Sequence, residues 1–321
     1  MHCPTRRQSL ILTAATAFGA LVPSVLRAQQ SPTIRIGQNV ADTFGEGLYG
    51  VDGGLFGAAG LNVEVQTFPN GAAQAAACIG GAIDVGLGEA TELANGISHG
   101  LPLAIFAGGA LYDSAAPSTV LCVAGNARFR TARDFEGQII AVPAITALSS
   151  MAVKAWLVKN GANLARVNFV ELPTSAMPAA LERGTVAAAH FGEPFLSAAG
   201  TAVRRFASPY DVIGKKFLIS DWFSTRGWLT ANPAVAKRLT DAIYTTARWA
   251  NSHHDASAAI LAKYTKIDVE LIRRMRRVSF ATSLEPQLIQ PVLDTALTYG
   301  GLTRHVDASE LIVVPKTEGG T

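Results

Sequence analysis

One stretch of the chain, residues 61–93, constrains the fold more than any other. Residues 62–68 alternate apolar and polar side chains as a half-buried strand does, Pro69-Asn70-Gly71 interrupts the pattern, and the next nine residues are rich in helix-forming alanine. A second short apolar run follows and ends at Leu87. This order is typical of a crossover unit in a parallel sheet, and ligands bind beyond the carboxyl ends of such strands. We therefore expect an α/β protein whose ligand-contacting loops include this turn and residues 88–91.

A degenerate copy of this unit lies about a hundred residues further on, at residues 166–196. In the copy, Pro173 stands for Pro69, Gly184 stands for Gly81, and Glu193 stands for Glu89. Chance similarity between two crossover units is the alternative interpretation. If the correspondence is real, the protein has two related lobes, and each presents a helix amino end and a glutamate at its strand ends. Two such lobes could face each other across a cleft.

The first 28 residues have the pattern of a cleaved secretory signal peptide. Arg6-Arg7 precede an uncharged run over residues 9–26, and small residues offer a cleavage point near Ala28. A retained membrane anchor fits less well, because Pro23 interrupts the run and the run is short for a span. We predict export to the periplasm, by either the twin-arginine or the general secretory route.

The charge balance excludes several classes of partner. Three of the 27 basic residues fall in the leader, so the remaining 24 match the 24 acidic residues. No basic field is left that would indicate binding to nucleic acid or to a membrane surface. The one dense basic cluster, residues 273–277, is interpreted as a solvated helix face, with a docking role as the alternative. A hydrophobic content of 49% with 16% charged residues is typical of a globular protein with sizeable cores.

Two connector-like stretches suggest how the chain divides. Residues 108–118 and 208–216 are rich in glycine, proline and small polar residues and are predicted to join elements rather than to form them. If the chain leaves one lobe at the first stretch and returns at the second, the two crossings form a hinge. The prediction is a discontinuous lobe one over residues 31–118 and 218–321, and a lobe two over residues 119–217. The helical carboxy-terminal part should back lobe one and wrap across the hinge.

Catalysis has little support in the sequence. No nucleophile elbow, phosphate-binding Walker loop, zinc-binding His-Glu-x-x-His pair or dinucleotide fingerprint stands in a usable context, and no Cys/His spacing indicates a metal site. His190 is interpreted as a packed residue, and Cys78 and Cys122 as buried free thiols. We therefore expect no enzymatic activity, no catalytic residue, no cofactor and no metal.

Binding has more support, with two opposing signals. Helix amino ends expected at Gly71, Thr146 and Ser175 would suit an anion or a carbonyl, and Thr146 could cap its helix. Glu89 and Glu193 instead suit an amine, a hydroxyl or a protonated ring nitrogen, because a carboxylate only accepts hydrogen bonds. Capping or hinge hydrogen bonds are the alternative role for both glutamates.

An ordered series of short segments resembles the periplasmic solute-binding proteins of ABC importers in the nitrate, sulfonate and taurine group. That group also includes binders of thiamine-pyrimidine precursors. Within residues 34–302, the matching segments are residues 54–56, 60–65, 81–86, 134–143, 179–184, 193–195 and 249–251.

The resemblance implies a bilobal type II periplasmic-binding-protein fold with two α/β lobes and a two-crossing hinge. It implies a monomer that captures a small organic solute between its lobes and delivers it to an ABC permease and ATPase complex at the inner membrane. It also implies ligand contacts from loops at the strand ends, here Gln38, Asn39, Asn70, Gly71, Glu89, Thr146, Glu193 and Trp222.

Two departures from the family pattern bear on the ligand. Glu89 stands where small or hydroxyl residues are common in the sulfonate binders, and these loops hold no arginine, which disfavours a doubly charged anion. The solute could be sulfonate-, nitrate- or taurine-like, or a heterocyclic precursor, and a molecule with both donor and acceptor groups fits best. Two alternatives stay open: an enzyme like the thiamine-pyrimidine synthases, whose cysteine-rich stretch is absent here, and a ligand-sensing subunit of a receptor.

Overall fold

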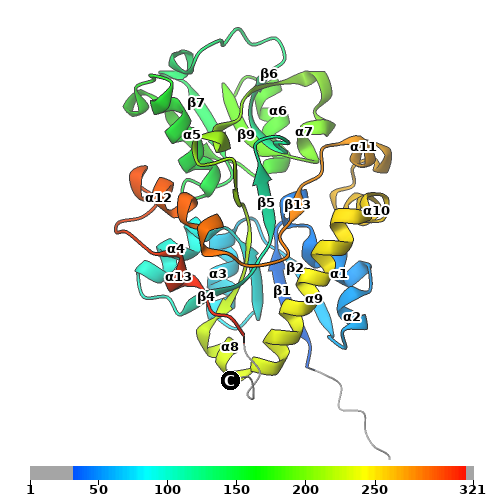
Figure 1. The fold of residues 1–321 in the computed structure, drawn as a ribbon. Helices are drawn as coiled ribbons and strands as arrows, with labels where there is room; N and C mark the ends of the chain where they lie inside the picture. Colours follow the sequence, from blue (N-terminus) through cyan, green and yellow to red (C-terminus); the bar gives the residue numbers. More distant parts are fainter. Residues whose placement is uncertain (1–31, 316–321) are drawn as a thin grey trace, which may run out of the picture. The chain divides into compact units, whose positions relative to one another are not determined.

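The computed structural model describes residues 32–315, and the expected leader lies outside this range. Two five-stranded mixed sheets and one three-stranded sheet form the framework (Figure 1). Each five-stranded sheet is covered by helices on both faces, so each is the centre of an α/β lobe. The predicted bilobal α/β fold is confirmed.

The first sheet has the strand order β2-β1-β3-β12-β4. Its strands are β1 (Ile34–Gln38), β2 (Val63–Thr67), β3 (Val85–Gly88), β4 (Leu103–Gly108) and β12 (Asp221–Thr225). β1 pairs in parallel with both β2 and β3, whereas β12 runs antiparallel between β3 and β4. The predicted crossover unit is therefore present, with β1 inserted between its two strands.

The second sheet repeats this arrangement with the order β8-β7-β9-β6-β10. Its strands are β6 (Thr119–Ala124), β7 (Ile139–Val142), β8 (Asn168–Glu171), β9 (Ala188–Gly192) and β10 (Val203–Ala207). β7 pairs in parallel with β8 and β9, and β6 runs antiparallel between β9 and β10. The order and the directions match the first sheet strand for strand.

The crossover helices of the two lobes occupy equivalent places. Helix α3 (Gly71–Ile79) joins β2 to β3, and α6 (Met177–Glu182) joins β8 to β9. The turns after these helices contain Gly81 and Gly184, whose φ angles of 73° and 69° favour glycine. The sequence similarity between the two units is therefore a structural repeat and not a chance match.

The chain crosses between the lobes through the third sheet. Strand β5 (Ala110–Asp113) leads from the first sheet to the second, and β11 (Lys216–Leu218) leads back. β5 pairs antiparallel with β11 and with β13 (Ser279–Phe280), and Figure 1 shows β5 and β13 between the lobes. The expectation that residues 108–118 form no element was wrong. Glycines and Pro117 flank a short strand there, and its partners lie about a hundred residues or more away in the sequence.

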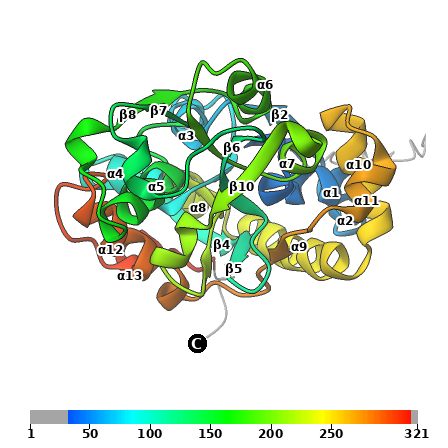
Figure 2. The same cartoon turned by 90° about the horizontal axis from the view of Figure 1, so that it is seen from above.

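The remaining helices complete the layers. In lobe two, α5 lies on one face of the sheet and α6 and α7 lie on the other (Figure 2). The helices not yet given are α1 (Glu46–Asp52), α2 (Leu55–Ala58), α4 (Ala90–Ser98), α5 (Leu148–Lys159), α7 (Phe195–Ala198), α8 (Arg226–Ala231), α9 (Pro233–Ser252), α10 (His254–Thr265), α11 (Val269–Arg274), α12 (Gln290–Thr298) and α13 (Ala308–Leu311). Short 3-10 turns are η1 (Asp42–Phe44), η2 (Ala132–Phe135), η3 (Leu164–Arg166), η4 (Thr174–Ala176), η5 (Gly200–Ala202), η6 (Pro209–Val212) and η7 (Pro286–Leu288).

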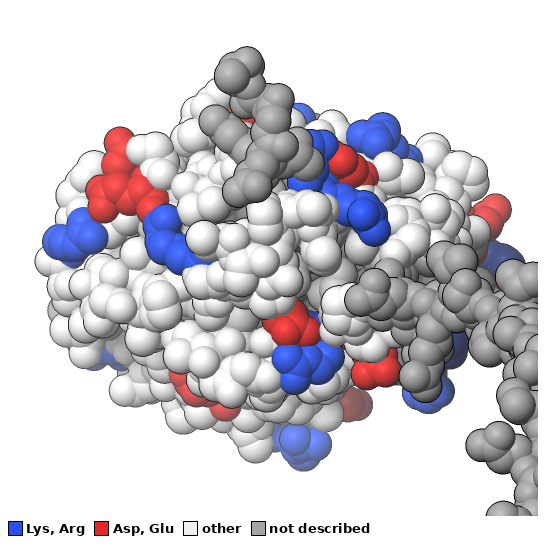
Figure 3. All heavy atoms as spheres, turned by 90° about the horizontal axis from the view of Figure 1, so that it is seen from below, with Lys and Arg blue, Asp and Glu red and all other residues white. Residues whose placement is uncertain are grey.

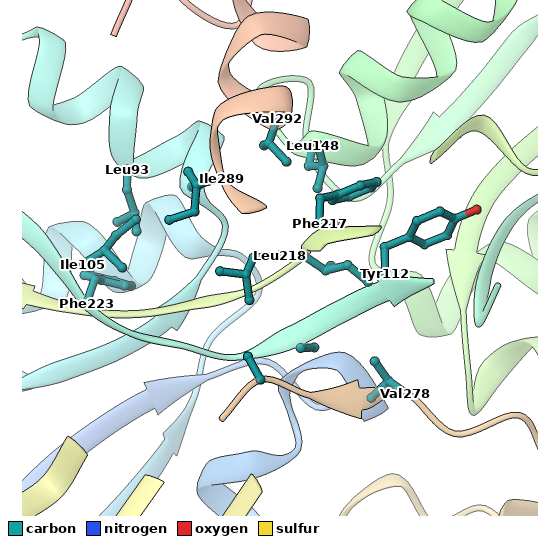
Figure 4. Packing of buried hydrophobic residues seen from close by; sticks show 14 of the residues in the cluster. Leu93, Ile105, Tyr112, Leu148, Phe217, Leu218, Phe223, Val278, Ile289 and Val292 are labelled. Carbon is teal, nitrogen blue, oxygen red and sulfur yellow. The ribbon is translucent and has the colours of Figure 1, made fainter. Parts of the chain in front are cut away.

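The carboxy-terminal helices pack as expected against the first lobe and across the hinge. α9 covers the first sheet and packs on α1 and α2, whereas α12 contacts both α4 of the first lobe and α5 of the second. Buried side chains join these parts into one core, in which Leu148 of α5 lies near Phe217 and Val292 (Figure 4). Packed side chains of α12 and its neighbours therefore cover one side of the hinge.

The basic cluster at residues 273–277 does not form a single solvated helix face. Helix α11 ends at Arg274, and the extended chain beyond it turns Arg277 inward, where its guanidinium lies 2.8 Å from Asp42 Oδ1 and 2.9 Å from the Tyr49 hydroxyl. The helical period on which the prediction rested stops before this residue. On the face seen in Figure 3, acidic and basic side chains are interspersed.

Candidate functional site

A cavity of about 350 Å³ lies between the carboxyl ends of the parallel strands of the two five-stranded sheets. Its walls come from the loops after β1, β2 and β3 in the first lobe and after β7, β8 and β9 in the second. Tyr210 and Ile219 close it near the crossings. The carboxyl ends of six strands from two related lobes thus converge on one site, which is the place where α/β sheets bind ligands.

Five of the eight predicted ligand residues line this cavity: Asn39, Asn70, Gly71, Glu89 and Glu193. The Asn70 side chain caps α3 by accepting from the amide of Ala73 at 2.9 Å. The Asn39 side-chain oxygen accepts from Gln74 Nε2 at 2.8 Å. Both asparagines are therefore held in place by lobe-one contacts, next to the open volume.

The other three predicted residues, Gln38, Thr146 and Trp222, do not border the cavity. Gln38 and Trp222 are fully buried, and the Trp222 indole donates to Glu46 Oε2 at 2.9 Å within the core of the first lobe. The Trp222 ring therefore offers no surface for stacking in this conformation. Thr146 is exposed and does not cap α5, whose N-cap residue is Ala147.

Other lining residues were not singled out from the sequence. Glu92 and Ser149 lie on helices α4 and α5 at the cavity wall, and Tyr210 comes from η6 in the second crossing. Glu92 could have been found, because it follows Glu89 by three residues at the start of a helix and so shares its face. Tyr210 had no such signal, since only the path of the crossing brings it to the site.

A hydrogen bond accepted by Glu89 joins the two lobes directly. The amide of Leu148, in the first turn of α5, donates to Glu89 Oε2 at 2.7 Å. Glu89 belongs to the first lobe and α5 to the second, so this carboxylate caps a helix across the cleft. The corresponding Glu193 caps within its own lobe, where it accepts from the amide of Ser197 at 2.9 Å. The capping role considered for both glutamates is present in the structure.

Glu92 approaches the amino end of α3 in the same manner. Burial raises the pKa of Glu92, and the backbone amides of Gly71 and Ala72, which face its carboxylate, offset part of that rise. A Cβ atom at position 71 would collide with Glu92 Oε2, so glycine makes room for this approach. In the loop before α5, the amide of Ile145 donates to Glu171 Oε1 at 2.7 Å. Backbone amides at the starts of α5 and α3 therefore already face cavity-lining carboxylates of the protein.

Burial makes these carboxyl groups weak acids. Desolvation, with the nearby Glu92 charge, raises the pKa of Glu89 to about 8, although the Leu148 amide pulls it down. Desolvation also raises the pKa of Glu92 to about 7. The pKa of Glu193 is raised by burial as well, against the opposing effects of Ser197 and of Arg205. Near neutral pH, Glu89 and Glu92 can therefore gain or lose a proton when a ligand enters.

His190 is fully buried at the cavity wall. Neither of its ring nitrogens has a hydrogen-bond partner among the described residues, and its ring lies edge-on to Tyr210 at 4.9 Å. Desolvation lowers the pKa of His190 to about 3, so the ring is neutral at physiological pH. A neutral imidazole offers one donor and one acceptor to a ligand.

Among residues 32–315, no lysine or arginine lines the cavity. Arg205 approaches Glu193 to 3.3 Å, with its own side chain 47% exposed, and is not part of the wall. Within the same range, no group of three or more His, Cys, Asp or Glu side chains could hold a metal ion. The carboxyl groups on the cavity wall are acidic, and the larger part of the cavity surface is apolar, with contributions from Phe44, Phe68 and Phe191.

Two lobes with the same strand order and a cavity between their strand ends define the class of periplasmic binding proteins. Solved structures share this fold at low sequence identity. The alkanesulfonate-binding protein from Xanthomonas axonopodis pv. citri, bound to MOPS, is 18% identical with a TM-score of 0.73, covering 89% of this chain and 100% of that one. The periplasmic nitrate-binding protein from Synechocystis PCC 6803 is 15% identical with a TM-score of 0.73, covering 87% and 84%.

A ligand-binding component of an ABC-type import system from Staphylococcus aureus, with zinc bound, is 13% identical with a TM-score of 0.76, covering 88% of this chain and 97% of that one. No curated protein sequence matches the chain. The family model of the NMT1-like family matches residues 27–265, and the chain belongs to this family. The predicted kinship with periplasmic solute-binding proteins of the nitrate and sulfonate group is confirmed. Over residues 32–315, the helices are too short or too polar for any of them to cross a bilayer.

Proposed function

We propose that this protein is exported, captures a small organic solute between its lobes and delivers it to an ABC permease and ATPase complex at the inner membrane. One observation carries the proposal: a single cavity is bordered by the carboxyl ends of six parallel strands from two lobes of the same topology. A volume of about 350 Å³ suits a small molecule rather than a peptide. Membership of the NMT1-like family supports the same class of function.

Binding without turnover fits the side chains of the cavity. Nucleophilic catalysis needs a nucleophile within hydrogen-bond reach of a base. His190 has no such partner among residues 32–315, and neither Cys78 nor Cys122 borders the cavity. In the described part of the chain, these residues therefore support solute binding over an enzyme like the thiamine-pyrimidine synthases that would act through a cysteine or through His190.

The proposal includes the lobe boundaries expected from the sequence, residues 31–118 with 218–321 and residues 119–217. It also includes Asn39, Asn70, Gly71, Glu89 and Glu193 as ligand contacts. Closure would bend the crossings near β5 and β11. The Tyr112 hydroxyl already ties these crossings together by donating to Asp211 Oδ1 at 2.7 Å.

Small-angle scattering of the mature protein, with a solute found by a thermal-shift screen, tests the proposal. A solute that binds the folded state raises the melting temperature, and closure makes the particle more compact. Chemical conversion of that solute at catalytic rates would refute the binding-only function. Mass spectrometry of protein from the native host should place the mature terminus near Gln29, and full-length protein in the cytoplasm would contradict export.

A further inference from the structure

The amino end of a helix is the natural place for this fold to bind an anion, because unpaired amides and a partial positive charge meet there. At this cavity, carboxylates of the protein already occupy the amino ends of two helices. Glu89 Oε2 accepts from Leu148 at the start of α5, a helix of 12 residues, and the Glu92 carboxylate faces the first amides of α3. The protein's own carboxylates therefore stand where an anionic ligand would be held.

The charges on the wall have one sign. Glu89, Glu92 and Glu193 all line the cavity, and no lysine or arginine in the described part of the chain joins them there. A sulfonate or a nitrate would lie next to these carboxyl groups without a cationic side chain on the described part of the wall to hold it. A cation would instead find up to three acceptors.

Unsatisfied polar atoms around the cavity point the same way. Glu92 Oε1 is buried and has no hydrogen-bond partner in the described residues, and neither does the Ser149 hydroxyl. Both ring nitrogens of His190, a fully buried side chain that lines the cavity, are also unpaired. Leaving a buried polar group unpaired is costly, so a ligand that bonds these atoms would be favoured. An ionised Glu92 only accepts, and the Ser149 hydroxyl and one nitrogen of the neutral His190 ring can also accept, so a ligand that brings N–H or O–H donors can satisfy all three groups.

We infer that the solute is a small organic cation or a readily protonated nitrogen base, such as an amine, an amidine or an amino-substituted heterocycle, whose nitrogen lies beside Glu89 and Glu92. The inference rests on the proposed solute-binding function and names its ligand class. Sulfonates and nitrate, which structural neighbours bind, are excluded from this cavity.

The pKa values of Glu89 and Glu92 predict how the affinity for a cation depends on pH. A cation favours the ionised carboxylates, so its binding releases protons and strengthens as the pH rises through the pKa values of Glu92 and Glu89, about 7 and about 8. An anion would instead take up protons and bind better at low pH. The titratable groups that surround the pair are Asp221, Glu171, Tyr210, His190 and Glu193.

The test compares matched probes on the mature protein by thermal shift and calorimetry. Benzamidinium, benzamide and benzenesulfonate share one ring and differ in charge, and panels of alkylamines, amidines and aminopyrimidines are set against alkanesulfonates and nitrate. We expect a cation to bind at least ten-fold more tightly than its sulfonate counterpart and to release protons. Glu89→Gln and Glu92→Gln should each weaken it about ten- to a hundred-fold. Glu182→Gln, an exposed site on α6 away from the cavity, is the control.

The outcomes separate the two proposals. Stabilisation by sulfonates or nitrate, and not by any of the cations, overturns the ligand class and leaves solute binding intact. Cation affinity that is unchanged in both glutamine variants also overturns the inference. If neither panel raises the melting temperature, and protein from the native host releases no small molecule on denaturation, then solute binding itself fails.

Discussion

Substituting Glu89 by glutamine should change how the stability of the ligand-free protein depends on pH. Burial raises the pKa of Glu89 from its ordinary value of 4.5 to about 8, so between these pH values the folded protein keeps a proton that the unfolded chain releases. A state that binds more protons loses stability as the pH rises, so the free energy of unfolding should fall from about pH 5 to pH 8. Glutamine cannot ionise and should remove this part of the fall.

The size of the effect follows from the distance between the two pKa values. Each pH unit corresponds to about 1.4 kcal/mol, so the full span would give at most about 5 kcal/mol. Glu89 keeps some solvent access, which reduces the desolvation that raises its pKa. We therefore expect the free energy of unfolding to fall by about 2 kcal/mol less in Glu89→Gln than in the wild type between pH 5 and pH 8.

Urea unfolding at half-unit steps from pH 5 to pH 8 measures this difference. Asp221 and Glu92, with pKa values raised to about 8 and about 7, add to the fall in both proteins. His190, whose pKa is lowered to about 3, opposes it below about pH 6.5 in both. The contrast between variant and wild type isolates Glu89, and Glu182→Gln should behave as wild type. Parallel curves for Glu89→Gln and wild type would refute the reasoning.

Three further predictions test the core of the fold. Asp42→Asn should destabilise the protein by about 3–5 kcal/mol by urea unfolding, because it leaves the buried Arg277 guanidinium without its charge partner, and a change below about 1 kcal/mol would contradict this pairing. Trp222→Ala should lower the free energy of unfolding by about 3–5 kcal/mol, because the ring is fully buried. The affinity of the folded variant for its solute should stay within about three-fold of wild type, since the ring lies outside the cavity wall. A large affinity loss in calorimetry would support its predicted role as a ligand contact. Cys78 and Cys122 are buried, and burial raises their pKa values to about 11 and about 12, so thiol reagents at pH 8 should label them only after denaturation; rapid labelling of native protein would show that they are accessible.

Much of the fold could be predicted from local patterns. The alternation of residues 62–68, the Pro-Asn-Gly break and the alanine-rich helix are properties of neighbouring residues, and they appear as β2, the turn and α3. The same signals recur around Pro173, where β8 and α6 form the equivalent unit. Strand β5 was not predicted because it is only four residues long and lies between stretches that contain glycine and proline. It is a strand because β11 and β13 pair with it.

The candidate site was predictable only in part. Asn70, Gly71, Glu89 and Glu193 follow predicted strands, and the carboxyl ends of parallel strands share one edge of a sheet, so their place at the cavity follows from topology. Trp222 lies in the core of the first lobe; an aromatic residue near a crossing can face either a cleft or a core, and local sequence does not distinguish the two.

The sequence by itself determined the two related lobes, the position of the strand ends and the residue types that follow them, because all three depend on short-range periodicity and turn chemistry. Only the tertiary structure decided what those residues contact. The Leu148 amide meets a carboxylate that lies 59 positions away in the sequence, and Arg277 meets Asp42 across 235 positions. Such pairs form because buried amides and charges must find partners when water is excluded, and which partners are near is set by the packing of the lobes.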